Sequence, residues 1–127
     1  MDAKSSELVV DIARMLMATM ERDVPGWQRA FWRFDASDSH YGSTGSYVTD
    51  QGISLLDPFT QPEFFEQANA KGASLREDLR NEGRGFCVAL LQVNAHFDFK
   101  MDYEWKDPRK WVITKMNGAS GMPSGLE

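Results

Sequence analysis

The residues best placed to do chemistry are four charged side chains in one short stretch, namely Asp98, Lys100, Asp102 and Glu104. An acid and a lysine two residues apart on one strand can hold a divalent cation and stabilise developing charge on a phosphate, as in nucleases of the restriction-enzyme type. Such a site also needs an acid on a neighbouring strand, and Asp35 is the candidate. A metal-dependent nuclease that uses Asp98 and Lys100 is therefore one hypothesis.

The overall charge argues against a nucleic-acid ligand. The chain has 19 Asp and Glu against 14 Lys and Arg, a formal net charge of -5. An acidic surface repels the phosphate backbone and speeds encounter with basic partners. His40, His96 and the single cysteine Cys87 have neither metal-ligand spacing nor the setting of a nucleophile, and the glycines form no phosphate-binding loop. The sequence therefore predicts a protein that is not an enzyme and that has no metal or cofactor.

The stretch that carries these charges has a strict period of two. Its other positions are all large and apolar or aromatic: Phe97, Phe99, Met101, Tyr103 and Trp105. Successive side chains of a strand point to opposite faces, so the pattern predicts a half-buried antiparallel strand. The aromatic face would enter the core and the charged face would meet water. Trp105, at the end of the strand, is either core or an aromatic anchor for a partner.

The rest of the chain predicts an α+β fold. An antiparallel β-sheet of about five strands would carry an N-terminal helix, a central helix and a short C-terminal helix packed on it. Residues 1–118 would form a single domain and residues 119–127 a mobile tail. The expected elements in order are a helix over 6–20, strands over 27–35, 47–49 and 52–56, a helix over 60–83, strands over 86–93 and 97–105, and a helix over 107–117.

Some details of these elements are more specific. Residues 86–93 are apolar at both parities, which predicts a central strand covered on both faces. Trp27 and Phe31 are expected to pack under the first helix. Gly72 should weaken the central helix by about 1 kcal/mol relative to Ala. The segment 35–46 is rich in Ser and Gly and is expected to be a loop or a broad hairpin connection. The register of the strands between residues 41 and 56 stays open.

Several aromatic and acidic patterns resemble a known family. They are Trp27 and Phe31, Phe64-Phe65 with Leu75-Arg76, Leu79 and Gly83, then Phe97-Asp98-Phe99, Asp102-Tyr103-Glu104 and Trp111. Together they resemble the YezG-like antitoxin and immunity proteins of polymorphic toxin and contact-dependent inhibition systems. This chain departs from the family at Gly42–Ser46, where an aromatic-rich strand is usual, and in the turn at Asn94–His96, which lacks the usual glycine.

The resemblance implies a small, acidic, cytoplasmic α+β protein that binds and neutralises a secreted toxin. With the acidic composition, it predicts an immunity protein that binds a basic toxin acting on nucleic acid, one to one. The residues expected to contact the toxin are Asp35, Asp38, Asp98, Asp102, Glu104 and Trp105. Neither a signal segment nor an apolar run near 18 residues is present, so a cytoplasmic protein without membrane contact is expected. The nuclease and a generic protein-interaction module remain the alternatives, and the oligomeric state is open.

Overall fold

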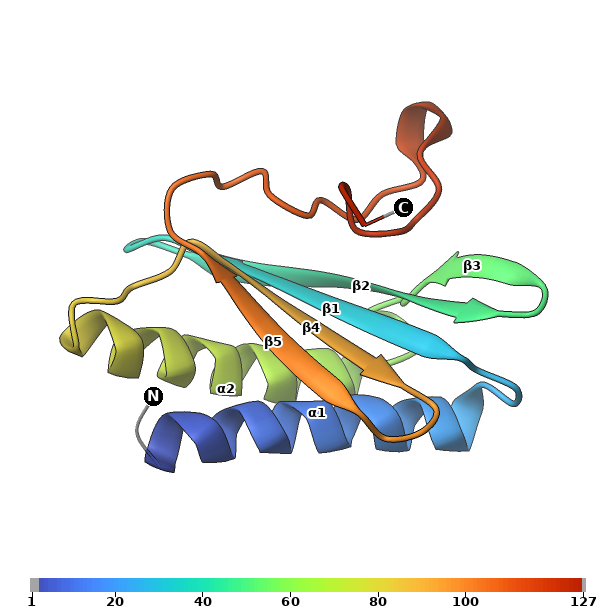
Figure 1. The fold of residues 1–127 in the computed structure, drawn as a ribbon, viewed down its shortest axis with the longest axis horizontal. Helices are drawn as coiled ribbons and strands as arrows, with labels where there is room; N and C mark the ends of the chain where they lie inside the picture. Colours follow the sequence, from blue (N-terminus) through green and yellow to red (C-terminus); the bar gives the residue numbers. More distant parts are fainter. Residues whose placement is uncertain (1–2, 127) are drawn as a thin grey trace.

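The chain forms two long helices and a five-stranded antiparallel sheet in the computed structural model, which describes residues 3–126 (Figure 1). This confirms the α+β class. The elements are α1 (Ala3–Asp23), β1 (Arg29–Ala36), β2 (Tyr41–Thr49), β3 (Gly52–Leu55), α2 (Pro62–Asn81), β4 (Val88–Asn94) and β5 (Phe99–Glu104), followed by a 3₁₀ turn at Met116–Gly118.

The strands lie in the order β3-β2-β1-β4-β5, so β1 is central and β3 and β5 are the two edges. The expected loop or broad hairpin connection over residues 35–46 is shorter than predicted, because β1 ends at Ala36 and β2 begins at Tyr41 and pairs with the whole of β1. Small residues are required in this part of β2. A Cβ at Gly45 would lie 2.8 Å from the carbonyl oxygen of Phe31 and 2.6 Å from the side chain of Leu56. The Gly- and Ser-rich segment is thus a strand that allows close approach.

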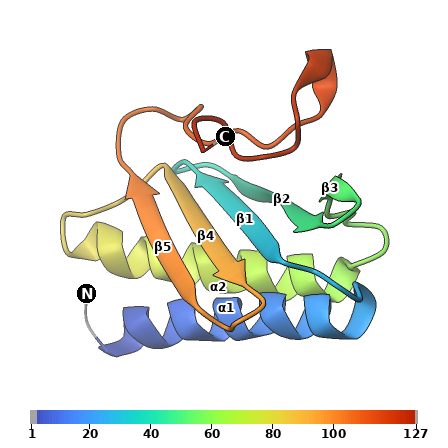
Figure 2. The same cartoon turned by 45° about the vertical axis from the view of Figure 1, so that its right-hand side comes forward.

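Both helices cover one face of the sheet (Figures 1 and 2). From β1, the fully buried residues Ala30, Trp32 and Phe34 point to that face. They meet the apolar stripe of α1, which buries Val9, Ile12, Leu16 and Met20, and that of α2, which buries Phe64, Phe65, Ala68, Leu75 and Leu79. The expected position of Trp27 in this core is confirmed.

The C-terminal segment covers the opposite face of the sheet (Figure 1). Phe31 lies there and not under α1, in a second core with Leu90 and Ile113 against which Met122 and Leu126 pack. The β4 strand is therefore buried on both faces, as its sequence predicts. Residues 119–126 were expected to be a mobile tail, but Gly121 and Pro123 are buried and Ser124 N–H donates to the carbonyl of Val112 at 3.0 Å. Glu127 lies outside the described residues.

Arg33 explains why the expected C-terminal helix is absent. Its side chain is buried, with 6% of the residue exposed, and its guanidinium donates to the carbonyls of Pro108 and Lys110, each at 2.8 Å. Those two carbonyls would accept bonds within a helix if residues 107–117 were helical. Trp111 also has a left-handed backbone, with φ of 59°. Only the 3₁₀ turn at Met116–Gly118 remains of the helix. No helix among residues 3–126 is long and apolar enough to cross a membrane.

Gly72 of α2 lies directly against the ring of Phe34, so the role expected of it needs correction. A Cβ at this position would stand 2.8 Å from the nearest ring carbon, and that ring is fully buried. Gly72→Ala should therefore lower the free energy of unfolding by about 1–3 kcal/mol through overpacking. Ala would otherwise favour the helix by about 1 kcal/mol.

Urea unfolding followed by circular dichroism checks this expectation. The control is Ala70→Gly, at an exposed position of the same helix, which should lose about 1 kcal/mol from helix propensity alone. If Gly72→Ala proves more stable than the parent, α2 does not approach Phe34 this closely in solution.

Candidate functional site

The charged and aromatic stretch forms the edge strand β5 and its two flanks. Its two faces are as expected, since Met101 and Tyr103 pack against the helix-side core. The burial is not as expected, because an edge strand is covered less than an internal one. Phe97 is 57% exposed, Phe99 43% and Trp105 50%, so none of the three is core. Phe97 precedes the strand and has a left-handed backbone with φ of 65°.

The residues that the nuclease hypothesis needs are not brought together. Asp35 pairs in register with Val88, which is opposite Glu104. Asp98 lies beside Asn94, whose backbone N–H donates to the carbonyl of Asp98 at 3.1 Å. Val88 and Asn94 are six residues apart on β4, so Asp35 and Asp98 lie about 20 Å apart along the strand direction. Lys100 forms an ion pair with Asp102 at 3.5 Å. Within residues 3–126, no group of three or more His, Cys, Asp or Glu side chains is placed to hold a metal ion.

Two of the expected docking acids stabilise the chain itself. Asp35 forms an ion pair with the buried Arg33 at 3.1 Å. Glu104 accepts hydrogen bonds from the backbone N–H groups of Lys106 and Asp107, at 3.0 and 3.1 Å. These two bonds favour the charged form and lower the pKa of Glu104. Both carboxylates thus help to hold the chain where it leaves β5 and crosses the sheet.

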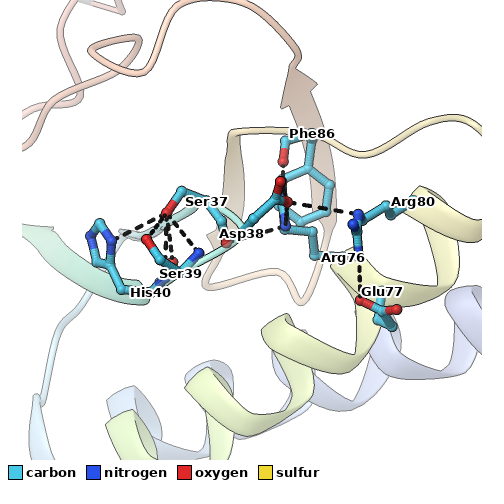
Figure 3. Close-up of polar contacts among 8 residues, drawn as sticks. All are labelled: Ser37, Asp38, Ser39, His40, Arg76, Glu77, Arg80 and Phe86. Atoms are coloured by element: carbon cyan, nitrogen blue, oxygen red, sulfur yellow. Dashed lines mark hydrogen bonds and ion pairs between the residues drawn. The ribbon is translucent and has the colours of Figure 1, made fainter.

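Asp38 lies apart from the β5 acids, in the turn between β1 and β2. Its carboxylate points to Arg76 and Arg80 of α2, at 3.4 and 3.7 Å (Figure 3). Arg76 also donates to the carbonyls of Phe86 and Ser37, at 2.9 and 3.2 Å. The turn is therefore fastened to the helix by Asp38. The six residues predicted as a docking face are thus spread over β1, the β1–β2 turn, and β5 with its two flanks.

The most exposed aromatic side chain was not predicted from the sequence. Phe59 is 94% exposed in the loop between β3 and α2, which we define as the Phe59 loop, residues 56–61. The carboxylate of Asp57 accepts from the backbone N–H of Phe59 at 2.8 Å, and the carbonyl of Asp57 accepts from the N–H of Gln61 at 2.9 Å. Leu56 is buried in the helix-side core. The aromatic ring is thus displayed on a turn whose ends are fixed.

The surroundings of Phe59 are acidic. Residues 34–70 contain six Asp and Glu and no Lys or Arg, although the whole chain has 14 basic residues. The exposed acids of this segment outside the β1–β2 turn are Asp50, Asp57, Glu63 and Glu66. Counting charges by segment, rather than over the whole chain, would have identified the acidic segment from the sequence. The exposure of Phe59 gives no such signal, because an isolated Phe in a loop is as easily buried.

Contacts with the end of α1 hold the Phe59 loop in place. The side-chain amide of Gln61 donates to Asp23 at 2.7 Å, and Arg22 donates to the amide oxygen of Gln61 at 3.3 Å. Arg22 also forms an ion pair with Asp23 at 2.9 Å. The hydrogen bonds from Arg22 and Gln61 lower the pKa of Asp23 to about 2. The loop is therefore joined to both the core and the helix layer.

No protein-family model matches this chain, and a search of curated proteins finds no significant relative. The resemblance to YezG-like proteins therefore stays a prediction from the sequence. The surface features above have to be interpreted from their own physical chemistry.

The carboxyl of Asp23 offers a test of the contacts that hold the loop. Its folded-state pKa of about 2 lies below the ordinary value of 3.8. Its contribution to stability should therefore be complete above about pH 4 and disappear as the pH falls through about 2. The difference in free energy of unfolding between the parent and Asp23→Asn should shrink over the same range.

Carbon-detected NMR titration of the Asp23 carboxyl gives the midpoint directly, and chemical unfolding at several pH values gives the stability difference. A midpoint near 3.8, or a difference that does not vary with pH, would show that Arg22 and Gln61 do not hold this carboxylate in solution.

Proposed function

We propose that the chain is an immunity protein that neutralises a basic toxin by binding it one to one, with the Phe59 loop at the centre of the contact. The observation that carries this proposal is the 94% exposure of Phe59 on a fixed turn. An aromatic ring held in water by local hydrogen bonds makes no contribution to the core. A rigid aromatic side chain is, however, typical of the residues that contribute most to protein–protein binding.

The charge around the loop supports a basic partner. Asp35 and Asp38 of this segment are ion-paired with arginines, and Arg22 lies beside the loop. The four exposed acids Asp50, Asp57, Glu63 and Glu66 outnumber that arginine and support a negative potential here. Such a potential speeds the encounter with a positive surface and disfavours acidic partners. Proteins that act on nucleic acid carry positive surfaces for their own substrate. An acidic inhibitor that covers such a surface would block access of the nucleic acid.

Two parts of the proposal, the toxin as the partner and the cytoplasm as the compartment, rest on the sequence alone. The resemblance to YezG-like immunity proteins supports a toxin as the partner, and the cytoplasm as the place where the two meet. A generic interaction module would share the Phe59 loop but not the toxin. A basic toxin-like reading frame next to the gene would favour the immunity function, and its product is the ligand to use.

Phe59→Ala should weaken binding to that toxin domain by about 2 kcal/mol or more, which is about 30-fold in dissociation constant. Most of the loss should appear as faster dissociation, because truncation of an anchor acts after encounter. The free energy of unfolding should change by less than about 0.5 kcal/mol, since the ring is exposed. Surface plasmon resonance gives the rate constants, and a urea melt gives the stability.

Two comparison variants locate the contact. Trp105→Ala removes a half-exposed aromatic at the opposite edge of the sheet and should leave binding unchanged. The double reversal of Asp98 and Asp102 to Lys tests the surface predicted from the sequence. Loss of binding in either of these variants, with Phe59→Ala unaffected, would place the toxin on β5. If the parent does not bind the neighbouring toxin at all, the immunity function is wrong.

A further inference from the structure

The outer edge of β5 combines a strand edge with exposed apolar side chains. Even-numbered residues of β5 direct their backbone groups to β4, as the pairs Gln92–Lys100 and Leu90–Asp102 and the bond from Asn94 N–H to the Asp98 carbonyl indicate. The backbone groups of Phe99 and Met101 therefore point outward. Since β5 ends the strand order, this edge is a template for another strand.

An apolar groove runs along the same edge on the helix side. It is lined by Val10, Ala13 and Met17 of α1, with Phe97 and Phe99 on its rim. Arg14 and Glu21 are the charged residues of the lining. A strand added to β5 would place every second side chain over this groove.

The order of residues from Phe97 to Trp105 is self-complementary about Met101 at every pair except Asp98 with Glu104. Reading outward from Met101, Lys100 is matched by Asp102, Phe99 by Tyr103 and Phe97 by Trp105. Aromatic residues thus fall opposite aromatic residues, and a cation opposite an anion, when the strand is paired with a reversed copy of itself.

We propose that β5 pairs antiparallel with β5 of a second copy, about a two-fold axis that passes beside Met101. The two sheets then form one continuous sheet, with all four helices on the same face. Such an isologous contact closes with two subunits. The Phe59 loop follows β3, at the other edge of each sheet, and stays accessible.

Charge complementarity selects this register. On the face away from the helices, Lys100 of each copy lies opposite Asp102 of the other. These are non-hydrogen-bonded pairs, in which opposed side chains approach most closely. Within each strand Lys100 and Asp102 are already 3.5 Å apart, so the four charges alternate in sign around the axis.

The neighbouring registers are less favourable. An axis beside Lys100 places that residue opposite its own copy, and an axis beside Asp102 does the same for the acid. An axis beside Phe99 pairs Lys100 with Asp98, but Phe99 is then the only residue of β5 that lies opposite β5 of the second copy, whereas the axis beside Met101 pairs Phe99 through Tyr103. In the proposed register the outermost pair, Asp98 with Glu104, has like charges, which limits the affinity of the dimer.

The aromatic residues support the same pairing. Phe99 lies opposite Tyr103 of the second copy, and Phe97 and Trp105, which flank β5, lie at the two ends of the paired segment. Three of these side chains, Phe97, Phe99 and Trp105, are between 43% and 57% exposed in the single chain. Pairing covers them at the mouth of the groove beside α1, and cross-strand aromatic pairs are among the favourable contacts of antiparallel sheets.

The test uses the full chain and two single charge reversals, Lys100→Asp and Asp102→Lys. Each variant places like charges opposite each other twice in its own homodimer, so its dissociation constant should rise by about tenfold or more. Mixed in equal amounts, the two variants should form a heterodimer. Positions 100 and 102 are both acidic in the Lys100→Asp variant and both basic in the Asp102→Lys variant, so every opposed pair then has opposite charges. Sedimentation equilibrium over a concentration series gives each dissociation constant, and a distinct fluorescent label on each variant identifies the heterodimer.

Each outcome decides the proposal. A parent that stays monomeric up to about 1 mM overturns it. So do single variants that dimerise like the parent, or a mixture that forms no heterodimer. Circular dichroism melts verify that both variants fold, and a misfolded variant is replaced by Lys100→Gln or Asp102→Asn, for which a smaller loss of self-association is expected.

A matched control separates the local contact from the change in net charge. Asp50→Lys changes the charge as Asp102→Lys does, but in the turn between β2 and β3, and should leave dimerisation unchanged. Toxin binding is measured separately, so failure of either proposal is distinguishable from failure of the other.

Discussion

The fold depends on a central strand that is buried on both faces. Every even-numbered residue of β1 from Ala30 to Phe34 enters the core beneath the helices, while Phe31 and Arg33 enter the layer under the C-terminal segment. Two separate cores therefore meet at one strand. The helix-side core takes Ala30, Trp32 and Phe34 from this strand, whereas the other contains a buried guanidinium. Arg33 has to be satisfied, and the carbonyls of Pro108 and Lys110 satisfy it.

That requirement determines the path of the last twenty or so residues. A buried cation that lacks partners is strongly destabilising, so the C-terminal segment is held across the sheet at the point where its carbonyls reach Arg33. Glu104 stabilises the start of this crossing, and Asp35 offsets part of the buried charge. Asp35 and Glu104, which the sequence suggests are solvated surface acids, thus help to hold the C-terminal segment across the sheet.

The sequence predicts most of the fold and less of the site, for identifiable reasons. Period-two alternation shows which way Met101 and Tyr103 point, but a strand's pattern does not tell whether it lies inside a sheet or at its edge. The exposure of Phe97 and Phe99 therefore could not be predicted. The Gly- and Ser-rich β2 violates strand propensity because Gly45 has to approach Phe31 and Leu56 closely, and only the tertiary context shows that need. Asp38 contacts Arg76 of α2, which is 38 positions away in the sequence, and local sequence patterns cannot predict such a contact.

The two edges of the sheet present different chemistry to solvent. The β3 edge leads into a loop with one almost fully exposed aromatic ring in an acidic segment, which is the arrangement expected for docking a positive partner. The β5 edge has Lys100 between Asp98 and Asp102 and aromatics arranged symmetrically about Met101, which favours a strand like itself over a uniformly basic surface. A long basic surface would be attracted by Asp98 and Asp102 but repelled by Lys100 between them. The net charge of the whole chain therefore does not distinguish the two edges, whereas the exposed acids Asp50, Asp57, Glu63 and Glu66 lie between the β2–β3 turn and the start of α2.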